Sequence, residues 1–160
     1  MWTVIDSPIG DLRLVAREGS VTQIEFHPFR DADGRPRGER ADDDPVLVEA
    51  ARQLRAYFAK ELTVFDLPLA PAGSEFQQRV WKELCTIGFG ETLTYGEIAR
   101  RLGMTATRAA RAVGVANGRN PIPVVIPCHR VIGADGTLTG YAGGLDRKQL
   151  LLSLEQGSLF

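Results

Sequence analysis

Cysteine and histidine are scarce in this chain of 160 residues, with two of each. Cys85 and Cys128 form no C-x-x-C pair, and neither His27 nor His129 has a spacing typical of zinc ligands. The sequence therefore predicts neither a disulfide framework nor a metal site, and it indicates no cofactor. A domain of this length buries enough surface to fold without such cross-links.

Long apolar runs are also missing, and no basic segment leads into an apolar stretch at the N-terminus. We therefore expect no membrane association and a cytoplasmic protein with reduced thiols. The net charge of -1 conceals an uneven distribution, because residues 95–130 contain six basic residues and one acidic residue. Such a stretch suits contact with a polyanion, although a solvated helix face has the same composition.

The first part of the chain predicts a small antiparallel sheet with one helix. Apolar and polar residues alternate in three segments separated by glycine or proline: 2–5, 12–16 and 21–26. Residues 46–58 are apolar at helical spacing, with Asp44 as N-cap and Pro45 in the first turn, and we expect this helix to cover one face of the sheet. Segment 30–44 has no apolar anchor and predicts a mobile loop, to which we assign no function.

The second part predicts mostly helices. Ser74 caps a helix over 75–84, and we interpret Cys85 at its end as a buried core thiol. The last helix is predicted to begin after Asp146 as N-cap, and it carries Glu155 near its end. Its buried stripe is predicted at Leu150, Leu151 and Leu154. The subdomain boundaries that follow are 1–66, a connection over 67–73, and 74–160.

A helix-turn-helix pattern lies between these helices. Thr94, with Glu97 three residues later, forms a capping box for a helix over 95–102, and residues 105–117 predict a second helix after a glycine turn. The second helix presents arginines among alanines and glycines. Small residues suit close packing on a neighbouring helix and close approach to DNA equally, so the pattern alone leaves both interpretations open.

Segment 122–132 combines an apolar run, two prolines, and a thiol, an imidazole and a guanidinium at positions 128–130. We interpret residues 124–126 as a short buried strand that ends at Pro127 and presents Cys128 at its edge. Neighbouring cations lower a thiol pKa and favour a nucleophile. A lone cysteine after an apolar run is more often a core residue, so both interpretations stay open here.

The ordered set of motifs resembles the O6-alkylguanine-DNA alkyltransferases, which repair DNA by direct reversal, and the resemblance extends from Trp2 to about Gly157. The matching segments follow the family's order: 76–81, 95–99, 111–114, 120–121, Pro127-Cys128-His129-Arg130-Val131, 141–144 and Glu155. The resemblance implies an α/β fold in which a ribonuclease H-like N-terminal subdomain, a small antiparallel sheet plus helix, joins a mostly helical subdomain that carries the helix-turn-helix and the alkyl acceptor.

The resemblance also implies the chemistry. Cys128 attacks the alkyl carbon on O6 of guanine and keeps the alkyl group as a thioether, so each molecule acts once. O4-alkylthymine is left open as a second substrate. A relay runs from Cys128 through water to His129, which Glu155 orients, and Tyr95 donates to the leaving base. The base must first rotate out of the duplex, and Arg111 fills the space that it leaves.

The implied partner is double-stranded DNA with alkylated bases, bound in the minor groove by a monomer, with cooperativity left open. The residues implied to contact DNA are Arg111, Thr94, Thr107, Arg108, Ala110 and Gly114. The residues implied to form the base pocket are Asn120, Tyr95, Val131, Tyr141, Ala142 and Gly143. With the resemblance in place, the small residues of the second helix are assigned to DNA contact and Cys128 to catalysis.

Two departures from the family pattern bear on function. Ala142 replaces a serine whose hydroxyl contacts the O6 atom in several members, which affects the expected substrate range. The connection over 102–107 is longer than in some members. Two rival functions remain: a helix-turn-helix protein that binds alkylated DNA without repairing it, which would need no acceptor cysteine, and a cysteine hydrolase, which would turn over.

Overall fold

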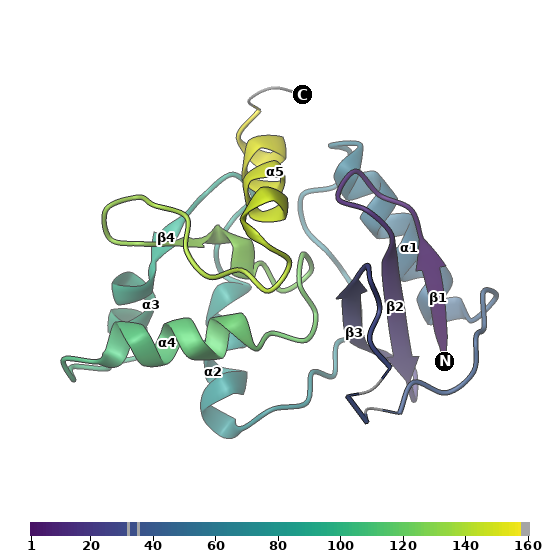
Figure 1. Ribbon diagram of the computed structural model, residues 1–160, viewed down its shortest axis with the longest axis horizontal. Helices are drawn as coiled ribbons and strands as arrows, with labels where there is room; N and C mark the ends of the chain where they lie inside the picture. The colour runs from purple at the N-terminus through teal and green to yellow at the C-terminus, as the bar shows by residue number, and fades with distance from the viewer. Residues whose placement is uncertain (32, 35, 158–160) are drawn as a thin grey trace. The chain divides into compact units, whose positions relative to one another are not determined.

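The computed structural model describes residues 1–31, 33–34 and 36–157, and positions 32, 35 and 158–160 of the predicted segments lie outside this description. The chain divides into two compact units, Met1–Ala72 and Gly73–Phe160 (Figure 1). The first unit contains β1 (Trp2–Ile5), β2 (Leu12–Arg17), β3 (Ser20–Phe26) and α1 (Pro45–Phe58). The second contains α2 (Glu75–Leu84), β4 (Leu93–Thr94), α3 (Tyr95–Arg101), α4 (Ala109–Gly118), the 3-10 helix η1 (Cys128–Arg130), β5 (Val131–Ile132) and α5 (Leu145–Gln156).

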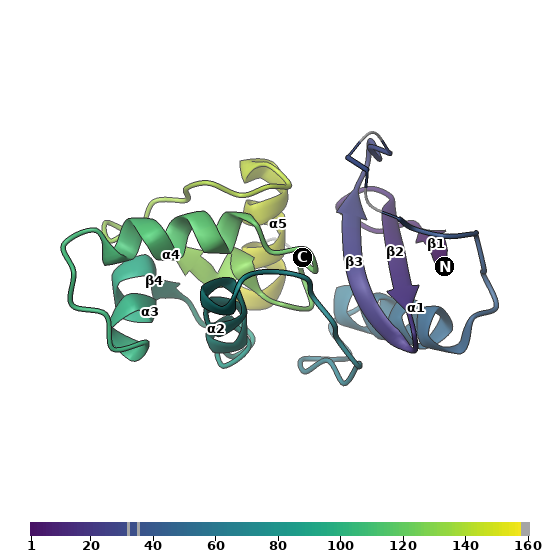
Figure 2. The same ribbon diagram turned by 90° about the horizontal axis from the view of Figure 1, so that it is seen from below.

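The first unit is an antiparallel sheet of order β1-β2-β3 with α1 against one face (Figure 2). Alternation along the strands places Leu12 and Leu14 in the core. The carboxylate of Asp44 accepts a hydrogen bond from the backbone N–H of Leu47 at 3.1 Å, and Pro45 begins the helix. The predicted α/β class, the three strands and the capped helix are therefore confirmed.

The segment predicted to be a mobile loop is anchored to the sheet. Its backbone pairs with β1, because Trp2 N–H donates to Glu39 O at 3.0 Å and Ala41 N–H donates to Trp2 O at 2.8 Å. Polar side chains make the remaining anchors, which a search for apolar residues does not detect. The prediction for 30–44 is corrected in this respect for the described residues.

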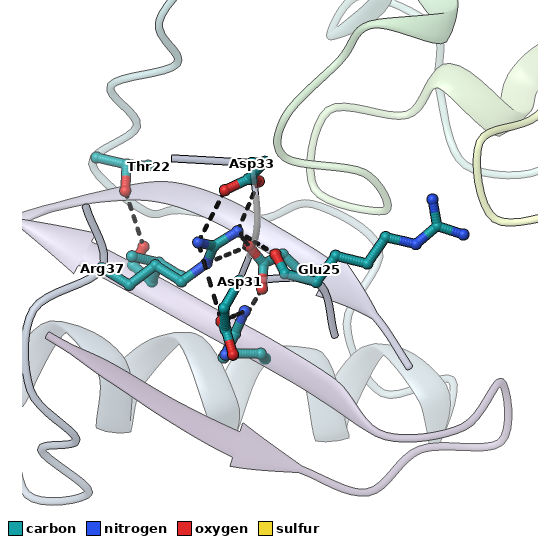
Figure 3. Close-up of polar contacts among 8 residues, drawn as sticks. Thr22, Glu25, Asp31, Asp33 and Arg37 are labelled. Carbon is teal, nitrogen blue, oxygen red and sulfur yellow. Dashed lines mark hydrogen bonds and ion pairs between the residues drawn. The ribbon is translucent and has the colours of Figure 1, made fainter. Parts of the chain in front are cut away.

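Arg37 is the main side-chain anchor of that segment (Figure 3). Its guanidinium lies 2.6 Å from Glu25 of β3 and 2.7 Å from Asp33, and the Arg37 side chain is 7% exposed. Arg13 of β2 contacts the second oxygen of Glu25 at 2.5 Å and Asp31 at 2.8 Å. The hydrogen bond to Asp33, followed by the contacts with Glu25, raises the pKa of Arg37 above its ordinary value despite burial. The cluster holds the segment by ion pairs instead of apolar contacts.

In the second unit, α2 forms as predicted. Ser74 and Gln77 form a reciprocal capping box, and the indole N–H of Trp81 donates to Ala116 O of α4 at 2.9 Å. Cys85 is exposed at the C-terminal cap, so the prediction of a buried core thiol is wrong. The buried stripe of α2 ends at Leu84, and the next core position is taken by Ile87.

The helix-turn-helix is formed by α3 and α4, but its second helix begins later than predicted. Helix α4 starts at Ala109 instead of residue 105, and no side chain caps it. Met104 N–H still bonds back to Ala99 O at 3.0 Å, and Ala109 N–H bonds to Ala106 O at 3.1 Å. The residues between α3 and α4 therefore close α3 and form a turn, and Thr107 lies outside the helix.

The apolar run before Cys128 is a turn, and the predicted strand over 124–126 is wrong. Val124 is fully buried with φ 71°, a conformation that excludes a strand. The Asn120 side chain accepts from Ile122 N–H at 3.0 Å and donates to Ile126 O at 2.8 Å. One amide thus satisfies buried backbone groups that a sheet would otherwise pair, and Cys128 follows as the first residue of η1.

Helix α5 begins at Leu145 with Gly144 (φ 90°) at the N-cap, so Asp146 lies in the first turn and is not the predicted cap. The buried side of α5 also differs from the prediction, because it includes Lys148 and Glu155 while Leu150 is only half-buried. Leu151 and Leu154 are buried as expected. The last helix therefore brings two charged groups into the interior of the second unit.

Candidate active site

A short parallel pairing assembles the site. Strand β4 pairs with β5, with Leu93 opposite Val131 and Thr94 opposite Ile132. Because η1 leads directly into β5 and Tyr95 directly follows β4, the pairing joins the segment of Cys128 to the start of α3. Cys128 is 5% exposed. Residues far apart in the sequence therefore meet around one buried thiol.

Glu155 is the centre of the polar contacts in this site. Its Oε2 lies 2.7 Å from His129 Nε2, and Arg130 donates to both carboxylate oxygens, at 2.8 Å from Nε and 2.9 Å from Nη2. Arg130 Nη1 also donates to Ile87 O at 2.6 Å. Gly90 N–H donates to Oε1 at 3.2 Å, and Gly90 has φ 80°, a conformation that favours glycine. The carboxylate is thereby paired with a guanidinium, and hydrogen bonds to both of its oxygens fix its orientation.

His129 is completely buried, and burial lowers its pKa below the ordinary 6.5, although the hydrogen bond to Glu155 opposes that shift. The neutral imidazole is therefore the resting form. Since the carboxylate can only accept, Nε2 carries the proton and Nδ1 carries the lone pair. Nδ1 is buried and has no hydrogen-bond partner among the described residues. The geometry leaves one basic atom available in the interior.

The Cys128 thiol is protonated at rest, because burial raises its pKa to about 11. A hydrogen bond from Asn120 and the positive charge of Lys148 oppose that shift. Arg130 is neutralised by Glu155 and is not among the groups that favour the thiolate. The sequence-based prediction that flanking cations lower the Cys128 pKa is therefore corrected: burial dominates, and the cation that acts is Lys148.

Lys148 is the main site residue that sequence reasoning missed. Its side chain is buried, and Nζ donates to Val131 O at 2.6 Å and to Thr139 O at 2.9 Å. Burial lowers the pKa of Lys148 below its ordinary value, and the nearby Cys128 opposes that shift. A signal was present in the sequence: Lys148 precedes Glu155 by two helical turns and so shares its face.

Two asparagines hold the backbone around Cys128. Asn117 of α4 donates from Nδ2 to Cys128 O at 3.3 Å, and its Oδ1 is buried without a partner among the described residues. Asn120, predicted as a pocket residue, is buried and holds the turn before Cys128. Asn117 was not singled out from the sequence, where it reads as one more polar residue at the end of a helix.

Tyr95 lies between α4 and the loop that follows β5. A Cβ atom at Gly114 would lie 3.7 Å from Cδ1 and Cε1 of the Tyr95 ring, an ordinary contact distance, so the ring lies directly beside α4 at this position. The Thr139 hydroxyl donates to Tyr95 Oη at 3.1 Å. The structure therefore brings Tyr95 and Gly114, two of the predicted site residues, together and adds Thr139 to them.

The remaining predicted residues separate by exposure. Thr94 is the N-cap of α3, and its Oγ1 accepts from Glu97 N–H at 3.1 Å, so its side chain is already engaged. The predicted DNA-contact residues that are exposed are Thr107, Arg108, Ala110 and Arg111. Of the predicted pocket residues, Val131, Tyr141 and Gly143 are buried, whereas Ala142 is exposed.

Comparison with known families decides what this arrangement is. Residues 75–157 match the 6-O-methylguanine DNA methyltransferase, DNA binding domain, and residues 1–71 match the 6-O-methylguanine DNA methyltransferase, ribonuclease-like domain. The chain belongs to the O6-methylguanine DNA methyltransferase family. The family resemblance inferred from the motifs is thereby confirmed.

Similarity to individual family members extends over the whole chain. A methylated-DNA--protein-cysteine methyltransferase of Methanosarcina barkeri is 50% identical over 158 residues, which cover 99% of this chain and 98% of the relative. Its counterpart in Mycolicibacterium paratuberculosis is 53% identical, with 97% and 92% covered. Among solved structures, Mycobacterium tuberculosis OGT in complex with DNA has a TM-score of 0.84 and 51% identity, with 98% of this chain and 92% of that chain covered.

Among the described residues there is neither a membrane-spanning helix nor a cluster of metal ligands. No helix within residues 1–31, 33–34 and 36–157 has the length and apolar character needed to cross a bilayer. Within the same part of the chain, no group of three or more histidine, cysteine or acidic side chains is placed to hold a metal ion.

Proposed function

We propose that this family member acts as a methylated-DNA--protein-cysteine methyltransferase, which repairs O6-methylguanine in DNA by moving the methyl group to Cys128. The observation that carries the proposal is a buried thiol followed in the chain by a buried imidazole whose Nδ1 has no hydrogen-bond partner among the described residues. A thiolate is the nucleophile in such a transfer, so a base must be at hand.

His129 is the proposed base. Its Nδ1 takes the proton of the Cys128 thiol through one water molecule, and the imidazolium that forms is stabilised by Glu155 at 2.7 Å. The charge separation that results is also favoured by Lys148, whose ammonium attracts the new thiolate. In addition to the His129 imidazolium of the relay inferred from the family resemblance, the Lys148 ammonium therefore stabilises the negative charge on the sulfur.

The transfer itself is a displacement at the alkyl carbon. The sulfur lone pair forms the S–C bond while the C–O6 bond breaks, and the electron pair of that bond stays on guanine. The guanine then needs one proton, which the Tyr95 phenol donates to the ring. The proton that Cys128 gave to His129 restores the phenol. A donor aimed at developing negative charge stabilises the transition state. The products are a Cys128 thioether and unmodified guanine.

DNA is the proposed partner of α3 and α4. A base within a duplex cannot reach a thiol that is 5% exposed, so the damaged nucleotide must rotate into the site. Arg111 is exposed on α4 and is proposed to fill the space that the base leaves. The small exposed Ala110 permits close approach, which suits the minor groove and gives little base specificity. A monomer suffices for this contact.

The substrate range follows from the pocket. Ala142 is exposed and offers no hydroxyl, so contact with the O6 atom either comes from the backbone or is absent. We propose O6-alkylguanine as the substrate, with O4-alkylthymine as a second candidate. Because the thioether is stable, each molecule acts once, and a thiol that must stay reduced fits the expected cytoplasmic location.

One experiment tests the proposed function directly. The protein is incubated with duplex DNA that carries O6-methylguanine with a labelled methyl group, and the digested protein is then analysed for labelled peptides. We expect label on the peptide of Cys128, at no more than one equivalent per molecule. The Cys128→Ala variant should bind the same DNA without accepting label, and Cys85→Ser should behave as the parent protein does.

The same experiment separates the rival functions. A protein that only binds alkylated DNA would retain the duplex and take up no label. A cysteine hydrolase would release the methyl group and continue beyond one equivalent. Either result would overturn the proposed function.

A further inference from the structure

Thr139 makes contacts on two sides of the site. It lies in the loop between β5 and α5, where its hydroxyl donates to Tyr95 Oη at 3.1 Å. Its backbone carbonyl accepts from Lys148 Nζ at 2.9 Å and, more weakly, from Tyr95 Oη at 3.4 Å. One residue therefore contacts both the proposed proton donor and the cation that favours the Cys128 thiolate.

We propose that Thr139 is a positioning residue that orients the Tyr95 phenol and couples it to Lys148. The inference rests on the proposed function, because Tyr95 needs to be aimed only if it donates to a departing base. It adds to the reaction a residue that none of the sequence motifs singled out.

Hydrogen-bond capacity explains how Thr139 aims the phenol. A phenol oxygen donates one hydrogen and accepts others, and a threonine hydroxyl that donates to it uses one acceptor position. The phenol proton therefore points away from the Thr139 hydroxyl. Its remaining partner, the Thr139 carbonyl, is 3.4 Å away, at the limit of a hydrogen bond. A base in the site can replace that weak partner while the contact from the hydroxyl stays in place.

Lys148 fixes the loop that carries Thr139. Its Nζ donates to Val131 O at 2.6 Å and to Thr139 O at 2.9 Å, which joins the start of β5 to the far end of the loop. Charged donors make shorter and stronger hydrogen bonds than neutral ones. Lys148 therefore helps to set the position of the Thr139 hydroxyl, and the charge of the same ammonium favours the Cys128 thiolate.

The location of the contact makes its strength depend on substrate. Thr139 is exposed and Tyr95 is half-buried, so water competes for both hydroxyl groups in the free protein. DNA bound over this surface excludes that water, and a hydrogen bond in a drier environment is stronger. We therefore expect Thr139 to affect the rate of transfer in the complex more than the stability of the free protein.

The test compares substitutions that differ by one hydroxyl. Thr139→Val removes the donor and keeps the shape, Thr139→Ser keeps the donor, and Thr137→Val is the matched control. Thr137 lies in the same loop, but its hydroxyl donates to Asp135 at 2.7 Å. Each variant is made in the parent chain and in a Tyr95→Phe background. Transfer of labelled methyl to Cys128 is timed at saturating duplex, and affinity for unmodified duplex and the melting temperature are measured in parallel.

We expect Thr139→Val to slow transfer about tenfold, which is the order of one net hydrogen bond, with DNA affinity unchanged. Thr139→Ser and Thr137→Val should transfer at the parent rate. In the Tyr95→Phe background, Thr139→Val should add no further loss, because the group that it orients is gone.

Two outcomes would overturn the inference while the proposed function stands. One is a Thr139→Val rate equal to that of Thr137→Val, and the other is an equal loss with and without the Tyr95 hydroxyl, which would mark Thr139 as a support of the loop alone. If the parent chain transfers no label to Cys128, the proposed function fails and the inference fails with it.

Discussion

The carboxylate of Glu155 lies 2.7 Å from the imidazole of His129, although 26 residues separate them in the chain. Both side chains are completely buried. The same carboxylate pairs with the guanidinium of Arg130 at 2.8 Å. Glu155 therefore has two functions at once: it compensates a buried cation and it fixes which nitrogen of His129 is the base.

Replacing Glu155 by glutamine should damage stability and transfer together. The amide leaves Arg130 without a counter-charge in the interior, and loss of one partner of a buried ion pair costs about 3 kcal/mol of unfolding free energy. Transfer should fall about a hundredfold, because the imidazolium is no longer stabilised. Denaturant unfolding and the label assay measure the two effects. Glu83→Gln, whose carboxylate lies 3.7 Å from exposed Arg101, is the control and should change neither.

Replacing Lys148 by methionine should slow transfer, because the positive charge that favours the Cys128 thiolate is removed. The rate of labelled-methyl transfer at neutral pH, in a Cys85→Ser background, measures the effect. Lys82→Met removes an exposed lysine of α2 and should leave the rate unchanged. A Lys148→Met variant that transfers at the parent rate would contradict the assignment of Lys148.

The pH dependence of the transfer rate should follow the protonation of the His129 imidazole. Neutral imidazole is the active form, so transfer is present above the pKa of His129 and is lost as pH falls through it. Burial lowers that pKa below the ordinary 6.5, and the rate should therefore hold constant from neutral pH to below 6.5 before it declines. Rates at saturating DNA across this range provide the measurement. His129→Gln should remove the decline along with most of the activity; a midpoint above 6.5 would contradict the burial argument.

Arg111→Ala should slow transfer from duplex DNA without slowing transfer from the free alkylated base. If Arg111 supports a rotated nucleotide, its loss slows transfer from O6-methylguanine in duplex DNA, by about tenfold or more, and leaves reaction with a free alkylated guanine base unchanged. Arg55→Ala removes an exposed arginine of α1 and serves as the matched control. Equal losses on the two substrates would remove the proposed function of Arg111.

Arg37→Ala should destabilise the first unit. The substitution deletes contacts with Glu25 at 2.6 Å and Asp33 at 2.7 Å from a side chain that is 7% exposed, which we expect to cost about 2 kcal/mol of unfolding free energy. Arg52→Ala removes an exposed ion pair with Glu49 on α1 and should have no measurable effect. Unfolding curves of the two variants decide whether the cluster of Figure 3 stabilises the fold.

The sequence predicted the elements whose signals are local. Alternation found β1, β2 and β3, and the caps at Asp44, Ser74 and Thr94 found their helices. The errors arose where tertiary contacts decide: Asn120 replaces a sheet ladder before Cys128, so an apolar run that resembles a strand becomes a turn. Within the site, the family motifs identified Cys128. They did not identify Lys148, because the sequence does not show that its ammonium is buried and bonded to Val131 O and Thr139 O.

The electrostatics of the thiol show the same limit. His129 and Arg130 follow Cys128 in the sequence, and adjacency suggested that both favour the thiolate. In the fold, Arg130 pairs with Glu155, while the cation that favours the thiolate is Lys148 of α5. Burial could not be assessed without the fold, and burial is the largest influence on the pKa of both Cys128 and His129.

Val124 has a further consequence for this chain. A branched residue with φ 71° carries strain of about 1–3 kcal/mol, whereas complete burial of its side chain contributes about 1.5–3 kcal/mol. The two effects are of similar size at this position. Glycine at position 124 would relieve the strain, but it would also leave a cavity and a freer backbone, so we expect a lower melting temperature together with more conformational freedom in the segment that presents the thiol.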